Sequence, residues 1–352
     1  MADLSPDAVR AALRGVLFPN FKRDVVTLGM VEAIDVADGV VAVRLRPGSD
    51  EAAVRDELQA RVERALRALP GVREVRVAMH AAAAGRGRDP FAQRAALPGV
   101  ARVVAVASAK GGVGKSTVAA NLAVALAALA PGRVGLLDAD VYGPSVPIVF
   151  GAYERPRMTG GKRILPVQRH GVRLVSMGFF LDESSPVIWR GPIVMGIVRQ
   201  FLQDVEWGTL DWLVVDLPPG TGDAVLTLAQ QVPITGGVVV TTPQDVALLD
   251  VGRGIAMFQH LQTPVLGVVE NMAGYVCEAC GVEDPIFGAG GGARLAAHFA
   301  VPLLGRIPLV PAVREQGDAG VPIVAARPDH LVSAAFRALA ERVVAAAAAA
   351  PA

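Results

Sequence analysis

Two groups of residues in this 352-residue chain could do chemistry, and the first is a glycine-rich loop. Residues 109–117 read AKGGVGKST, with a lysine directly before a serine and a threonine. Glycines let several backbone N–H groups turn toward one phosphate, and a lysine at this spacing reaches the β- and γ-phosphates of a nucleotide. The neighbouring hydroxyl of Ser116 or Thr117 is a ligand that Mg²⁺ accepts. The loop therefore predicts a phosphate and Mg²⁺ site made by Ala109, Lys110, Gly111, Gly112, Val113, Gly114, Lys115, Ser116 and Thr117.

The segments on either side of this loop are those that must position it. The apolar run 103–107 predicts a buried parallel strand, and residues 118–128 have helix-forming composition with no breaker. Strand, glycine loop and helix in this order are the context in which such a pattern becomes specific. Ala109 stands where the usual pattern opens with glycine, so we expect a turn that tolerates a Cβ atom at that position.

Polar side chains follow three later apolar runs of the chain. Asp138 and Asp140 end one run, Asp216 ends another, and Asn271 ends a third. The carboxyl ends of parallel strands form the ligand-binding edge of a sheet. We expect one aspartate of the pair Asp138 and Asp140 to orient the attacking water or hold Mg²⁺ through water, with a turn or helix cap as the alternative for each. We expect Asp216 to hold a Mg²⁺-bound water. Asn271 can offer its amide to an adenine edge or simply end its strand, and residues 308–311 would flank the base.

The second chemical group is Cys277-Glu278-Ala279-Cys280. A C-x-x-C pattern brings two sulfurs within reach of one metal or of each other, so a redox dithiol, a metal or Fe–S site and two unliganded thiols all compete. A closed tetrahedral site needs about four ligands. The chain has two cysteines in total, and none of its five histidines lies within fifteen residues of them. A cysteine-ligated site must therefore be shared between two chains, which predicts a homodimer.

Bulk composition excludes several functional classes. Thirty-four basic residues balance 33 acidic ones without a basic block, so nothing favours nucleic acid as a partner. No apolar run approaches the roughly 20 residues of a membrane span. Two cysteines exclude a disulfide framework. The first residues include Asp3, Asp7, Arg10 and Arg14 where a signal peptide would be apolar, so we expect a cytoplasmic protein.

Residues 1–80 predict a small α+β domain. A helix starts at Ser5-Pro6-Asp7, and an amphipathic helix covers 51–69. The expected strands are 25–36, 40–45 and 72–79, with a hairpin turn at 37–39. Residues 81–99 are rich in Ala, Gly, Arg and Pro and predict a linker in which Arg86, Arg88 and Arg94 are solvated charges.

From residue 100 onward, strands and helices alternate, which predicts an α/β domain over 100–344 with a mostly parallel sheet and helices on both faces. Short apolar pieces at 174–177 and 187–189 precede a helix at 192–204. The last helix covers 328–344, and 345–352 form an alanine-rich tail.

Six motifs in order carry a family resemblance: SAKGGVGKST, LLDADVYGPS, VVDLPPGTGD, VENMAGYVCEACG, IFGAGGG and LLGRIPLVPAVREQGDAGVPI. Residues 100–344 closely resemble the Mrp/ApbC family of P-loop ATPases, and residues 1–80 resemble the N-terminal domain of many members, which is shared with SufT-type factors. The resemblance implies an iron–sulfur cluster carrier that binds and slowly hydrolyses ATP, dimerises, holds a labile [4Fe–4S] cluster between paired C-x-x-C loops and passes it to apo-proteins. It makes Cys277 and Cys280 cluster ligands, and it gives catalytic roles to Lys110, Lys115, Asp140 and Asp216. Lys110 resembles the lysine of the deviant P-loops of the MinD/ParA class, which reaches the partner's nucleotide.

Two other functions compete with this interpretation. A MinD/ParA-type positioning ATPase that acts on a membrane or chromosome would need a basic amphipathic C-terminal helix. The last predicted helix instead sets Arg337 and Arg342 against Asp329 and Glu341. A zinc-bridged scaffold dimer is the second alternative, and the identity of the bound metal would separate it from the carrier.

Overall fold

The computed structural model describes residues 4–18, 24–27, 30–45, 52–79, 94–160, 163–180, 191–220 and 223–350. The chain forms two compact units, Met1–Asp89 and Pro90–Ala352.

The first unit packs two helices on a three-stranded sheet. Its elements are α1 (Pro6–Leu13), β1 (Val31–Ala37), β2 (Val40–Leu45), α2 (Ala52–Arg67) and β3 (Glu74–Met79). β1 pairs antiparallel with β2, and β3 pairs parallel with β2. The side chain of Ser5 accepts the N–H of Ala8 and caps α1, as Ser-Pro-Asp predicts. The expected α+β unit is therefore present.

The predicted strand 25–36 is wrong in its first half. The Asp24 carboxylate accepts the N–H groups of Val26 and Thr27 at 3.0 and 2.8 Å. This side-chain turn ends extended structure before β1 begins at Val31. The hairpin is confirmed, with Asp38 and Gly39 at positive φ as a two-residue turn requires.

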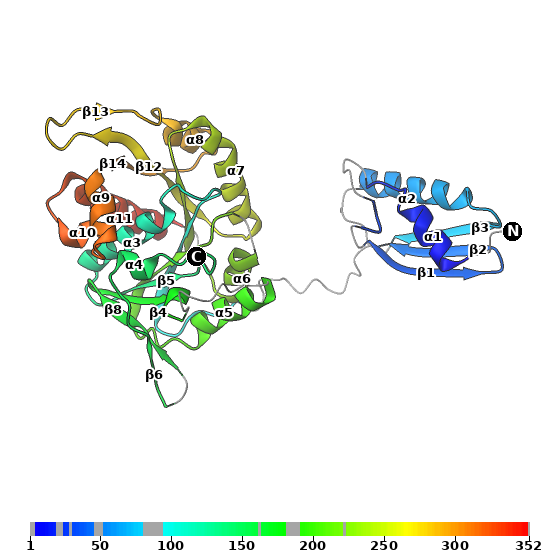
Figure 1. The fold of residues 1–352 in the computed structure, drawn as a ribbon, viewed down its shortest axis with the longest axis horizontal. Coiled ribbons are helices and arrows are strands. Elements are labelled where there is room, and N and C mark those ends of the chain that lie inside the picture. Colours follow the sequence, from blue (N-terminus) through cyan, green and yellow to red (C-terminus); the bar gives the residue numbers. More distant parts are fainter. Residues whose placement is uncertain are drawn as a thin grey trace. The chain divides into compact units, whose positions relative to one another are not determined.

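A mostly parallel sheet organises the second unit (Figure 1). Its order is β13-β12-β11-β4-β10-β5-β9-β8, with β14 paired to β12. Pairings are parallel except at β8 and β13, which pair antiparallel with β9 and β12. The strands are β4 (Val100–Ala107), β5 (Val134–Asp138), β8 (Val167–Arg169), β9 (Val172–Ser176), β10 (Leu210–Asp216), β11 (Gly236–Thr241), β12 (Val265–Val276), β13 (Glu283–Asp284) and β14 (Leu303–Leu309). β6 (Arg157–Met158) and β7 (Ile164–Leu165) form a separate ribbon.

Helices cover both faces of this sheet, as predicted (Figure 1). One face carries α3 (Lys115–Leu129), α4 (Val146–Val149), α9 (Pro311–Asp318), α10 (Ile323–Ala326) and α11 (Leu331–Ala349). The other carries α5 (Gly191–Gln203), α6 (Asp223–Gln231), α7 (Asp245–His260) and α8 (Gly291–His298). Alternate residues of β4 divide between the two cores, with Val104 and Val106 in one and Val103 and Ala105 in the other.

Two predictions about connecting segments are wrong. Arg94 is not a solvated linker charge, because its guanidinium donates to the carbonyls of Ala229 and Leu261 at 2.6 and 2.5 Å. The alanine-rich segment after residue 344 is not a separate tail either. It continues α11 to Ala349 and buries Ala347, since alanine has the highest helix propensity. The apolar piece at 187–189 lies outside the described residues.

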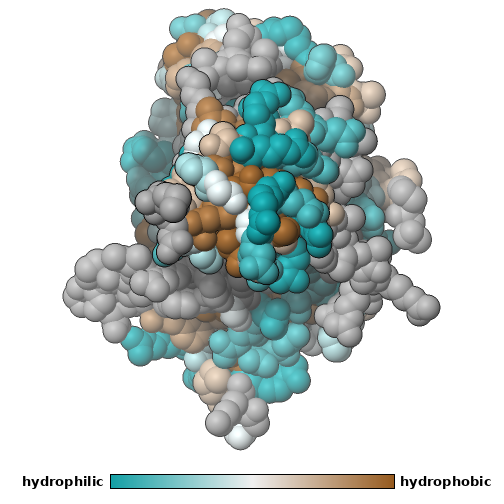
Figure 2. All heavy atoms as spheres, turned by 90° about the vertical axis from the view of Figure 1, so that its right-hand side faces the viewer, coloured by the Kyte–Doolittle hydropathy of each residue, from teal (hydrophilic) through white to brown (hydrophobic). Residues whose placement is uncertain are grey.

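No helix in the described part of the chain is long and apolar enough to cross a membrane. On the face shown in Figure 2, hydrophobic residues near the centre are bordered by hydrophilic ones.

Candidate functional site

The glycine loop joins β4 to α3 and leaves open space above its backbone. Gly112 and Gly114 have φ angles of 82° and 77°, which side chains rarely adopt, and α3 begins directly afterwards at Lys115. A Cβ atom on Gly111 or Gly112 would meet no atom within 4 Å. Ala109 does not have a positive φ, so its Cβ is tolerated as expected. An uncovered loop at a helix N-terminus can accept a phosphate group.

Lys115 brings the predicted phosphate loop and both predicted carboxylates together. Its Nζ lies 2.5 Å from Asp216 Oδ1 and 3.7 Å from Asp140 Oδ2, and it donates to Ser116 Oγ at 3.2 Å. Lys115 is only 6% exposed. Lys110 differs, because it is exposed and its side chain has no partner among the described residues. One lysine is thus held inside the site, while the other points to solvent.

Asp216 carries an unsatisfied buried oxygen. Within the described part of the chain, its Oδ2 has no hydrogen-bond partner, and the side chain is fully buried. Burial raises the pKa of this carboxyl above its ordinary value, and Lys115 opposes that shift. An orphaned carboxylate oxygen near the Ser116 hydroxyl is a donor set that fits Mg²⁺ or a water bound to it.

Asp138 is a functional candidate that the sequence reasoning passed over in favour of Asp140. Its Oδ1 accepts the N–H of Asp140 at 3.1 Å, and its Oδ2 accepts the Ser176 hydroxyl at 2.9 Å and the N–H of Val146 at 3.3 Å. Burial raises the pKa of Asp138 to about 8, and the neighbouring Asp216 adds to the shift. Asp138 therefore fixes the loop that carries Asp140. The sequence shows both aspartates at the strand end, but it does not indicate that Asp138 holds the loop while Asp140 faces Lys115.

A cavity of about 360 Å³ adjoins the glycine loop and has the size of a small-molecule site. It is lined in part by Thr117, Asn271, Pro308 and Leu309. Asn271 donates its Nδ2–H to the carbonyl of Val113 at 2.8 Å, so one amide hydrogen is already used within the protein. The predicted contact of Asn271 with adenine stays a prediction; Asn271 and Pro308 both line this cavity beside the glycine loop.

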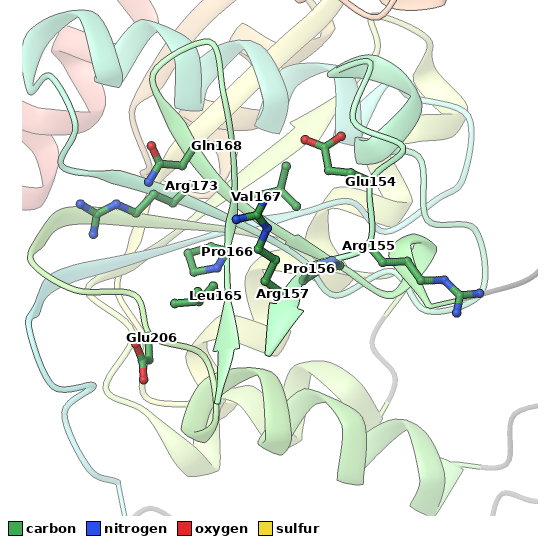
Figure 3. A pocket seen from close by; sticks show the side chains of 10 residues that line it. All are labelled: Glu154, Arg155, Pro156, Arg157, Leu165, Pro166, Val167, Gln168, Arg173 and Glu206. Atoms are coloured by element: carbon green, nitrogen blue, oxygen red, sulfur yellow. The ribbon is translucent and has the colours of Figure 1, made fainter. Parts of the chain in front are cut away.

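A larger hollow of about 530 Å³ lies elsewhere, between the β6–β7 ribbon and β8 (Figure 3). Pro156, Arg157, Leu165 and Val167 line it, and Arg155 points away from it. It shares no lining residue with the glycine loop, so the larger volume does not identify the nucleotide site.

The two thiols lie at the tip of a β-hairpin formed by β12 and β13, which we call the cysteine hairpin (residues 275–284). Cys277 is half-buried and Cys280 is exposed. The N–H of Cys277 donates to the carbonyl of Val282 at 3.0 Å, and that of Gly281 donates to the carbonyl of Cys277 at 2.8 Å, which closes the loop. Hydrogen bonds from the backbone N–H groups of Cys280 and Ala279 lower the pKa of Cys277 and favour its thiolate.

Few other metal-binding side chains approach these thiols. Glu278 accepts from His330 Nε2 at 2.9 Å and lies 3.9 Å from Arg327 Nη1. No group of three or more His, Cys, Asp and Glu residues that could hold a metal occurs in the ranges that the structure describes. Within the described residues of one chain, the two cysteines are therefore not part of a set of three or more side chains that could hold a metal.

Both the first and the second unit of the chain are similar in sequence to known iron–sulfur proteins. Residues 99–344 match the family of NUBPL iron-transfer P-loop NTPases, and residues 6–78 match a family of iron-sulfur cluster assembly proteins. The chain is 44% identical to the iron-sulfur cluster carrier protein of Synechocystis sp. over 97% of each chain. It is 41% identical to that of Escherichia coli over 97% of this chain and 93% of the relative.

Solved structures support the same fold. A nucleotide-binding protein in complex with ADP from Archaeoglobus fulgidus is 39% identical, with a TM-score of 0.57 over 64% of this chain and 89% of that one. The cell division ATPase MinD of Pyrococcus furiosus has a TM-score of 0.52 at 23% identity, over 69% of this chain and 98% of its own. The latter similarity concerns the fold alone.

Proposed function

This chain belongs to the iron-transfer P-loop NTPase family that includes the iron–sulfur cluster carrier proteins, and from that membership we propose that it is an ATP-hydrolysing carrier of a [4Fe–4S] cluster. Two copies would hold the cluster between their C-x-x-C loops and pass it to apo-proteins. The observation that carries this proposal is the cysteine hairpin, because its strand β12 also supplies Asn271, which contacts the glycine loop.

In the nucleotide site, the proposal gives each charged side chain a separate task. Incoming phosphates compete with Asp216 for the ammonium group of Lys115, and the backbone N–H groups of the loop bind the phosphate oxygens. Ser116 or Thr117, and Asp216 through a bound water, would hold Mg²⁺, which would supply positive charge to the β- and γ-phosphates. Asp140 is held by the N–H of Gly143 at 3.3 Å and orients the attacking water.

Lys110 has a role across the dimer in this proposal. Its side chain is exposed, so its ammonium group is available to a nucleotide bound by a second copy. Hydrolysis would then need two chains, whereas nucleotide binding would need only one.

In the cluster site, the thiolate character of Cys277 favours cluster binding, and the exposure of Cys280 favours cluster transfer. The lowered pKa of Cys277 favours iron binding, because the thiolate is the ligand form. The exposed position of Cys280 leaves a bridged cluster accessible to an acceptor thiolate. Both steps need reduced thiols, which agrees with the predicted cytoplasmic location.

Anaerobic reconstitution with iron and sulfide tests the cluster assignment. We expect about four irons and four sulfides per dimer, as a [4Fe–4S] cluster requires, and their loss in Cys280→Ser. Ala279→Ser is the matched control, because it places a hydroxyl in the same loop without removing a thiol. Zinc alone, or an unchanged iron content in Cys280→Ser, would contradict the carrier assignment.

A pair of lysine substitutions tests the nucleotide assignment. Lys115→Ala should abolish ADP binding measured by calorimetry, while Lys110→Ala should keep ADP binding and lose ATP hydrolysis. If Lys110→Ala hydrolyses ATP at the wild-type rate, the proposed role across the dimer is wrong. Both variants should still take up iron and sulfide, since neither residue lies in the cysteine hairpin.

A further inference from the structure

Strand β12 is kinked between the nucleotide site and the cysteine hairpin. Met272 has a φ of 55°, a left-handed conformation that is strained for a residue other than glycine. The pairing with β14 moves from Asn271 opposite Ile307 to Tyr275 opposite Leu309, so β12 uses four steps where β14 uses two. Extra residues of this kind bend a strand and re-aim the segment beyond the bend. The kink therefore sets the direction in which the cysteine hairpin leaves the sheet.

The residues at the kink touch the glycine loop. Asn271 donates to the carbonyl of Val113, and a Cβ atom built on Gly114 would lie 2.3 Å from Asn271 Nδ2 and 3.6 Å from the Met272 methyl carbon. The loop and the kink are thus in close contact. A displacement of the loop by bound phosphates must displace the kink or break this contact.

The guanidinium group of Arg306 spans the kink from the neighbouring strand β14. Its Nε donates to Glu270 Oε1 at 3.0 Å, and its Nη2 donates to the carbonyl of Ala273 at 3.3 Å. The same Nη2 lies 3.6 Å from Glu283 Oε1 on the return strand of the cysteine hairpin. Arg306 therefore contacts β12 before the kink, β12 after the kink, and β13.

The first of these contacts is buried and the last is exposed. Glu270 is fully buried, and its Oε2 also accepts the N–H of Gly292 at 2.5 Å at the start of α8. The side chain of Glu283 is about half exposed. Arg306 thus links the buried carboxylate of Glu270, before the kink at Met272, to the exposed carboxylate of Glu283 on β13.

We propose that Arg306 is a positioning residue that transmits nucleotide binding at the glycine loop to the cysteine hairpin. This inference rests on the proposed function, because it assigns the coupling of the same two sites. Phosphates on the loop shift Asn271 and Met272, and Arg306 forces Glu283 and the thiols to follow. Without Arg306, the kink still moves, but the hairpin no longer follows it.

A lysine cannot replace this contact set. The planar guanidinium donates in fixed directions from Nε and both Nη atoms, whereas a lysine places three donors on a single nitrogen. Arg306→Lys therefore keeps a cation beside the buried Glu270 and loses the simultaneous contacts with Ala273 and Glu283. Glu283→Gln removes the charge of the exposed contact alone and leaves the buried anchor intact.

The test measures how fast the two thiols react in protein that carries no cluster. Alkylation of Cys277 and Cys280 by monobromobimane is timed after anaerobic reduction and removal of the reductant, with and without ADP, and the sites are resolved by mass spectrometry. In the wild type, ADP should change the alkylation rate by at least about fivefold, the lower range of typical coupling. In Arg306→Lys and Glu283→Gln, this ratio should fall toward one while ADP affinity and thermal midpoint stay at wild-type values.

Asp284→Asn is the matched control, because Asp284 is the next carboxylate on β13 and its side chain has no partner in the described part of the chain. It should keep the wild-type ADP effect. A wild-type ADP effect in Arg306→Lys, or the absence of any ADP effect in the wild type, would overturn the inference. Because the readout needs no iron, it separates this failure from a failure to bind a cluster.

Discussion

Replacing Lys115 by methionine should destabilise the second unit before any nucleotide is added. The ammonium group lies 2.5 Å from Asp216 and 3.7 Å from Asp140, and Asp216 is fully buried with one oxygen that has no partner among the described residues. Removing one partner of a buried pair costs about 3–5 kcal/mol, because the other charge stays in a poorly solvating interior. At a urea slope of about 3 kcal/mol per molar, the midpoint should fall by about 1–2 M.

Tryptophan fluorescence during urea unfolding is a suitable measurement. The three tryptophans, Trp189, Trp207 and Trp212, all belong to the second unit, so the signal reports that unit by itself. Lys115→Met should show this fall in the midpoint, and the double variant Lys115→Met with Asp216→Asn should recover most of it, since removing both charges is often close to neutral.

Arg133→Met is the matched control for this prediction. Arg133 pairs with Asp211 at 2.5 Å, but its side chain is 53% exposed, so its loss should cost below about 1 kcal/mol. If Lys115→Met costs no more than Arg133→Met, the buried pair does not stabilise the fold. If the double variant is as unstable as the single one, the cost does not come from an uncompensated carboxylate.

Two further predictions concern the same loops. The pKa of Asp138 is raised on folding to about 8, so the stability that its protonation contributes is fully present below the ordinary pKa near 3.8 and is lost as pH rises through 8. Asp138→Asn should therefore flatten the decline of the urea midpoint between about pH 6 and pH 8, while Asp211→Asn should keep the wild-type decline. Gly112→Ala should destabilise the protein by about 1–2 kcal/mol through its φ of 82°, whereas Gly111→Ala should cost much less, because neither added Cβ meets an atom and only Gly112 has a positive φ. Equal thermal midpoints for the two alanine variants would contradict this assignment.

The sequence allowed the sheet and its helices to be predicted because apolar runs and glycines report on local structure. The run before the glycine loop is a strand, although β4 begins three residues earlier than expected, and α3 begins at Lys115 rather than at 118. Strand β12 extends to Val276, beyond Asn271, which ends the apolar run in the sequence. The polar Asn271 and the left-handed Met272 interrupt its apolar pattern, while tertiary pairing with β14 continues.

The side-chain contacts around the glycine loop and the cysteine hairpin were harder to predict from the sequence than the strands and helices. Lys115, Asp140 and Asp216 could be placed at one sheet edge from strand ends, and the structure does bring them together. Nothing local in the sequence indicates that Arg306 contacts Glu270, because the pair is 36 residues apart and depends on the register of two parallel strands. Arg94 was misjudged for the same reason, since its carbonyl partners lie more than a hundred residues away.

The exposed position of the C-x-x-C loop also determines which conditions harm this protein. A thiolate at Cys277 attacks oxidants readily, and Cys280 is close enough in sequence to resolve the product into a disulfide. A hairpin with free thiols is therefore sensitive to oxidation, and on the proposed function iron bound by Cys277 and Cys280 would protect their sulfurs. Oxygen should then convert the two thiols to a disulfide and prevent the proposed cluster binding, and a thiol reductant should restore the thiols without refolding the rest of the molecule.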